Sequence, residues 1–147
     1  MKKLKFTTHI QASPERVWKC LWDPEDYKIW THFFHEGSYY RTDGFKEGNK
    51  IHFLTPEGDG LCSRFVSIVE NKHLSLKHLG EIKNYKEMPI KDETKSWAGG
   101  METYTLQPVE GGTKVVITTD ILEEYIEFMN TTYPLALSEL KRISEQK

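Results

Sequence analysis

Residues 10–18, which read IQASPERVW, mark the point where a strand gives way to a helix. Upstream, residues 3–10 alternate between apolar and polar side chains, which is the period of a half-buried strand. Ser13 is a favourable helix N-cap, and Pro14 suits the first helical position because that position needs no N–H donor. We therefore expect a strand over residues 3–10 and a helix from Pro14 to about Leu21.

Downstream, the pattern changes from helical to strand-like. Asp23-Pro24-Glu25 predicts the start of a second short helix, and from Gly37 onward short runs rich in β-branched and aromatic residues are separated by Gly, Asn and Asp. Six strands are predicted, at residues 38–42, 50–55, 61–69, 73–80, 100–108 and 113–122. Their short connections indicate an antiparallel meander. The charged segment 81–98 predicts a long exposed loop, which is long enough to act as a lid.

The C-terminal segment carries apolar residues at spacings of three and four, the stripe of an amphipathic helix over residues 123–147. Pro134 interrupts this stripe, so we expect it to kink the helix or split it near Thr131 and Thr132. The order of elements predicts one α+β domain over residues 1–147, with a bent antiparallel sheet of about seven strands wrapped around the final helix. A cavity between sheet and helix is a natural by-product.

Composition narrows the classes of function. The formal net charge of −2, with basic and acidic residues interspersed, offers no basic face for nucleic acid. No apolar run is long enough to insert into a membrane, and no signal sequence opens the chain, so we expect a cytoplasmic protein. Cys20 and Cys62 have no nearby partner at zinc spacing, and His32 and His35 lack a third ligand. The sequence predicts no metal and no cofactor.

The chain resembles the START-like superfamily, whose shared architecture is the helix-grip fold, and within it bacterial proteins similar to the activator of the heat-shock-protein-90 ATPase. The stretches that carry this resemblance are IQASPERVW with Trp30 downstream, FKEG at residues 45–48, residues 97–106, and TYPLAL at residues 132–137. The resemblance implies the same fold. It also implies a range of functions, including lipid carriage, polyketide cyclisation and contact with a heat-shock chaperone.

The hairpin over residues 61–80 supplies the candidate polar groups. If its loop is residues 70–72, Arg64 pairs with His78 and both face one way, and a family-like strand order brings Glu102 beside them. Such a group would bind a carboxylate, carbonyl or phenol of a ligand. Two alternatives stay open: the three residues form a structural network only, or a register slip of one residue turns Arg64 to solvent.

Aromatic side chains are expected to line the rest of the pocket: Trp30, Phe34, Phe53, Trp97 and Tyr104. No nucleophile stands in a recognisable catalytic setting, so no catalytic residue is predicted. The leading hypothesis is a binding protein for a small apolar or amphipathic molecule. The alternatives are a co-chaperone-like interaction module and an enzyme of the cyclase or dehydratase kind, with His78 or Glu102 moving a proton.

Overall fold

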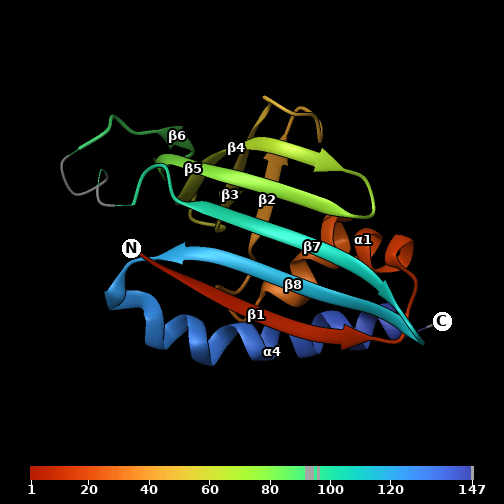
Figure 1. Ribbon diagram of the computed structural model, residues 1–147. Coiled ribbons are helices and arrows are strands. Elements are labelled where there is room, and N and C mark those ends of the chain that lie inside the picture. Colours follow the sequence, from red (N-terminus) through yellow and green to blue (C-terminus); the bar gives the residue numbers. More distant parts are fainter. Residues whose placement is uncertain (92–94, 96, 147) are drawn as a thin grey trace.

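The computed structural model describes residues 1–91, 95 and 97–146 and has an α+β architecture (Figure 1). Eight strands are found in this part of the chain: β1 Lys2–Ile10, β2 Tyr39–Thr42, β3 Lys50–Leu54, β4 Gly60–Val69, β5 His73–Lys83, β6 Lys86–Glu87, β7 Met101–Val109 and β8 Gly112–Ile121. The helices are α1 Pro14–Trp22, α2 Pro24–Thr31, the 3₁₀ turn η1 Glu123–Tyr125 and α4 Ile126–Glu145. The predicted fold class is confirmed.

All the strands pair antiparallel in one bent sheet, in the order β1-β8-β7-β5-β4-β3-β2, with the short β6 paired to β5. Helix α4 runs alongside β1, and α1 and α2 pack against α4 (Figure 1). The main core fills the space between them and joins sheet residues such as Leu76 and Ile117 to helix residues such as Leu21 and Leu140. None of the helices in the described ranges has the length and hydropathy of a membrane span.

The start of α1 forms as the sequence predicts. The Ser13 hydroxyl accepts a hydrogen bond from the backbone N–H of Arg16 at 3.2 Å, and Pro14 follows the cap. The Arg16 guanidinium then reaches across to the end of α4, where it donates to the carbonyls of Ile143 at 3.0 Å and Gln146 at 3.2 Å. Carbonyls in the last turn of a helix have no partner within the helix, so one side chain fixes the position of α4 against α1.

Pro134 does not split the final helix, so this part of the prediction is wrong. Helix α4 continues through Pro134 for 20 residues. Pro134 and Asn130, whose carbonyl loses its N–H partner, both lie on the exposed face, where water can satisfy that carbonyl. Tyr133 just before the proline and Leu137 one turn after it are both buried, and their packing holds both halves of the helix against the core.

The predicted loop over residues 81–98 is also partly wrong. Strand β5 continues to Lys83, and a tight turn at Asn84 and Tyr85, both with positive φ, leads into β6. The Tyr85 hydroxyl donates to the carbonyl of Pro56 at 2.9 Å, which fixes this turn to the β3–β4 connection. The lid prediction also falls on residues 92–94 and 96, which lie outside the described residues.

The hairpin β4–β5 has the predicted loop but not the predicted register throughout. Val69 pairs with His73 and Ile68 with Leu74, as expected, and Asn71 has the positive φ of the turn. Beyond this point Val66 is an extra residue on β4, and Leu79 is an extra residue on β5. Between these two β-bulges the pairs are Phe65 with Leu76, Arg64 with Lys77 and Ser63 with His78. The expected pairs of Val66 with Leu76 and Arg64 with His78 are wrong.

Candidate functional site

A cavity of about 480 Å³ lies between the concave face of the sheet, α2 and the first turns of α4. This volume is typical of small-molecule sites. Seven of the eight predicted site residues line it: Trp30, Phe34, Phe53, His78, Trp97, Glu102 and Tyr104. The structure therefore brings together every predicted residue except Arg64.

The sheet places His78 and Glu102 at the same end of the cavity. Strand β7 pairs with β5, and the backbone N–H of His78 donates to the carbonyl of Gly100 at 2.9 Å. His78 Nε2 then lies 3.7 Å from Glu102 Oε2, too far for a direct hydrogen bond but close enough for a shared ligand atom. His78 Nδ1 lies 2.7 Å from the Ser63 hydroxyl. A carboxylate at Nε2 favours the proton on that nitrogen, so Nδ1 accepts from Ser63.

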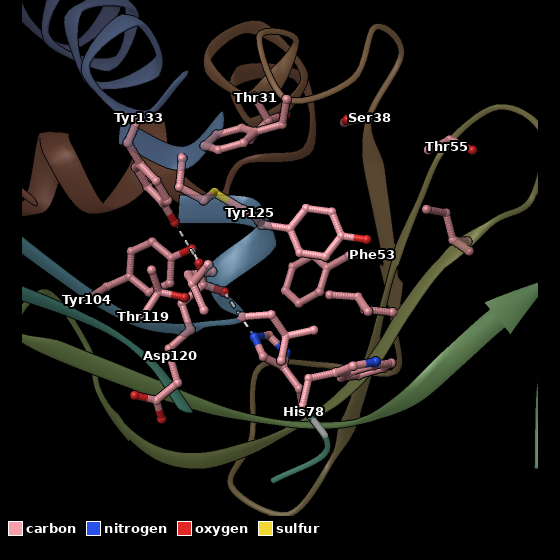
Figure 2. A pocket seen from close by; sticks show the side chains of 18 of the residues that line it. Thr31, Ser38, Phe53, Thr55, His78, Tyr104, Thr119, Asp120, Tyr125 and Tyr133 are labelled. Carbon is pink, nitrogen blue, oxygen red and sulfur yellow. Dashed lines mark hydrogen bonds and ion pairs between the residues drawn. The ribbon is translucent and has the colours of Figure 1, made fainter. Parts of the chain in front are cut away.

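Two tyrosine hydroxyls satisfy the other oxygen of Glu102. Tyr104 donates to Oε1 at 3.0 Å and Tyr133 at 2.6 Å (Figure 2). Phe6 stacks on the Tyr133 ring and Phe34 meets it edge-on, which fixes the direction of its hydroxyl. Burial, reinforced by the Glu102 charge, raises the pKa of both phenols well above the usual tyrosine range. Both tyrosines are therefore neutral donors to a partly buried carboxylate.

The cavity wall is acidic. Among the described residues that line it there is no Lys and no Arg, whereas Glu81, Glu102 and Asp120 are present. Asp120 turns its carboxylate away from the other labelled side chains and binds the ammonium of Lys3 at 3.1 Å (Figure 2). Its other oxygen accepts from the Met101 N–H at 2.9 Å. Glu102 has only hydroxyls and an imidazole around it, so this carboxylate dominates the polar end.

Arg64 lies outside this site, which corrects the predicted convergence. Because the Val66 bulge shifts the register by one residue, Ser63 occupies the inward position opposite His78 and Arg64 faces solvent. Its guanidinium donates to the carbonyl of Gly48 at 2.8 Å on the outer side. Without this cation, the expected fit to a ligand carboxylate no longer holds.

Comparison with known families identifies the chain. The family model for activator of Hsp90 ATPase homolog 1-like proteins matches residues 11–142. The chain belongs to this family. No curated protein sequence matches it significantly.

Solved structures share the fold of this chain. The Aha1 dimer from Colwellia psychrerythraea is 26% identical with a TM-score of 0.71, covering 99% of this chain and 97% of that one. Protein CV1439 from Chromobacterium violaceum is 18% identical with a TM-score of 0.69, covering 100% of both chains. An AHSA1-like protein from Aeromonas hydrophila is 19% identical with a TM-score of 0.67, covering 98% and 92%. Family and fold support a ligand-binding or interaction module.

Sequence reasoning missed two members of the polar end in this family member, Ser63 and Tyr133. Tyr133 falls at helical spacing within the apolar stripe of the final helix, yet a buried tyrosine hydroxyl needs a partner, and that requirement is a usable signal. Ser63 had no such signal, because its inward direction depends on the bulge at Val66. A bulge leaves little trace in a single sequence.

Proposed function

We propose that the protein binds a small, largely apolar molecule carrying a hydroxyl or phenol group in the cavity between the sheet and α4. The observation that carries the proposal is the Glu102 carboxylate, held in an aromatic cavity by Tyr104 and Tyr133, with no Lys or Arg among the described residues that line it. A partly buried carboxylate favours ligands that donate hydrogen bonds and disfavours ligands with a negative charge.

The gap between His78 and Glu102 suits a hydroxyl in particular. Nε2 of His78 and Oε2 of Glu102 lie 3.7 Å apart, and Oε2 makes no hydrogen bond to any residue that the structure describes. A ligand hydroxyl placed between them would accept from Nε2–H and donate to Oε2. Trp30, Phe34 and Phe53 would then contact the apolar part of the ligand.

Calorimetric titration with a matched pair of ligands tests the proposal. We expect 1-naphthalenemethanol to bind about tenfold or more tightly than 1-naphthoate at pH 7, because the carboxylate of the acid would meet Glu102. Glu102→Gln should shrink this preference, since it removes the charge and keeps a carbonyl acceptor for the tyrosines.

Two further variants distinguish binding in the cavity from binding at the outer surface. Leu61→Trp places a larger ring on the half-exposed wall of the cavity and should abolish binding of the alcohol, whereas Arg64→Ala, on the outer side, should leave binding unchanged. The proposal is rejected if neither naphthalene binds, if the acid binds more tightly, or if Leu61→Trp binds as the wild type does.

The family match favours a second candidate, contact with a heat-shock chaperone through the protein surface. The family model that matches residues 11–142 is that of activator of Hsp90 ATPase homolog 1-like proteins. An ATPase assay with the chaperone of the same cell would show stimulation in this case. Leu61→Trp should then leave stimulation intact, because its effect is confined to the cavity.

A further inference from the structure

Three potential metal ligands meet on the convex side of the sheet, opposite to the cavity. His52 lies on β3, Cys62 on β4 and Glu87 on β6, and one ligand atom of each lies within 4.8 Å of the other two. Cys62 packs in a small cluster with Leu54 and Ile82 that is separate from the main core. None of His52, Cys62 and Glu87 lines the cavity. Their strand neighbours Phe53 and Leu61 do line it, and side chains alternate along a strand, so this cluster lies on the outer face.

The backbone arrangement holds these three residues together. His52 and Cys62 are direct partners in the β3–β4 ladder, so their side chains leave the sheet on the same side. Glu87 returns to this place through the turn at Tyr85, whose N–H donates to the carbonyl of Gly58 at 2.8 Å. Opposite Cys62 on β5 stands Gly80, which has no side chain to separate Glu87 from the other two.

A thiolate, an imidazole and a carboxylate form a donor set that suits Zn²⁺. We propose that His52, Cys62 and Glu87 bind a zinc-like divalent ion, with water in the remaining coordination position. The side chains of His52 and Glu87 are 26% and 43% exposed, so an ion can enter and a water ligand can reach it, while the Cys62 thiol lies at the buried end.

Without the ion, Lys50 balances the charge of Glu87. Glu87 accepts from Lys50 at 3.0 Å through Oε1, and Oε2 lies 3.1 Å from His52 Nε2. The ion would take the place between Oε2, Nε2 and the sulfur, leaving Lys50 on Oε1. Burial, followed by the nearby Glu87 charge, raises the pKa of the Cys62 thiol to about 11, so the thiol is protonated in the free protein. Binding would release this proton and form the metal–sulfur bond.

Cobalt titration of the tag-free, reduced protein tests the site, because a Co²⁺–thiolate bond absorbs in the near ultraviolet. We expect this band in the wild type and its loss in Cys62→Ala. His52→Gln and Glu87→Gln should weaken Co²⁺ binding at least tenfold. Matched controls are Cys20→Ala, a buried thiol in the main core, and His9→Gln, an exposed histidine on β1, and both should keep the band.

A second measurement guards against misfolding of the variants. Zn²⁺ should raise the Tm of the wild type in proportion to the logarithm of its concentration, and this rise should vanish in Cys62→Ala while circular dichroism shows a folded protein. The absence of a cobalt–thiolate band in the wild type would overturn the proposal. A band that persists in Cys62→Ala would overturn it equally, since the sulfur would come from elsewhere.

Discussion

The two faces of strand β4 carry similar residue types in opposite settings. On the concave face Ser63 meets His78, and Glu102 lies beyond it among tyrosines. One residue earlier, Cys62 faces outward beside His52, with Glu87 at the edge. Each face thus has a histidine and a carboxylate, and the surroundings decide what each pair can bind.

The partner of the carboxylate makes the difference. The hydrogen bond from Lys50 lowers the pKa of Glu87, so this carboxylate already carries its charge beside a cation at the surface. Among the described residues, Glu102 instead accepts hydrogen bonds from two uncharged hydroxyls, and its side chain is 15% exposed. A carboxylate among neutral donors suits an uncharged ligand, whereas one beside a thiol and an imidazole at the surface suits a metal ion.

The largest expected effect on the free energy of unfolding concerns the inward-facing and outward-facing residues of β4. Phe65 is 1% exposed and packs in the core, whereas its neighbour Val66 is 47% exposed at the bulge. Phe65→Ala should lower the free energy of unfolding by about 3 to 5 kcal/mol, whereas Val66→Ala should change it by less than about 0.5 kcal/mol. Urea unfolding measures both. Equal losses would mean that the bulge, and with it the inward position of Ser63, is misplaced.

A smaller effect is expected at the hydroxyls that surround Glu102. Tyr133→Phe removes a buried donor to a charged acceptor and should reduce the free energy of unfolding by about 2 kcal/mol. Thermal or urea unfolding at pH 7 checks this. Phe6→Leu, which alters the stacking on the same ring but keeps the hydroxyl, serves as the comparison. No loss in Tyr133→Phe would show that Glu102 does not depend on this donor.

The smallest effect concerns Asp120, a cavity-wall carboxylate that pairs with Lys3. Burial alone would raise the pKa of Asp120, but the Met101 N–H and Lys3 outweigh it and lower the pKa overall. A lowered folded-state pKa stabilises the protein above the unfolded Asp value of about 3.9 and loses this contribution as pH falls through the folded value. In Asp120→Asn the fall of stability with pH below about 4 should be less steep, by less than about 1 kcal/mol in total. An unchanged pH profile would show that the pair with Lys3 contributes nothing.

The sequence was sufficient for most of the fold because its signals are local. The Ser13 cap, the Pro14 helix start and the turn at Asn71 each depend on neighbouring residues, and all three are confirmed. Strand β6 was missed because it has only two residues and is fixed by distant contacts, such as that of Tyr85 with Pro56. The split expected at Pro134 does not occur, because helix propensity does not report tertiary packing.

The candidate site was predictable in composition but not in detail. His78 and Glu102 share a face with apolar neighbours, and simple alternation places both of them correctly. Arg64 was misplaced because alternation fails at a bulge, and the chemistry expected of the ligand changed with it. The contact of His52 with Cys62 could not be predicted from the sequence for a related reason, since residues that pair across strands have no fixed spacing in the sequence.

The bulges at Val66 and Leu79 have a consequence for the shape of the cavity. Bulges concentrate the bending and twisting of a sheet at single positions. The three pairs between them, from Ser63 with His78 to Phe65 with Leu76, therefore form a short segment of the β4–β5 ladder with a bend at each end. Substitutions of lining side chains would change the local shape of the cavity wall. Changes at the two bulges would instead reorient the whole ladder segment and alter the width of the cavity. Val66 and Leu79 are thus the positions at which substitutions would change the size of the molecule that the cavity can hold.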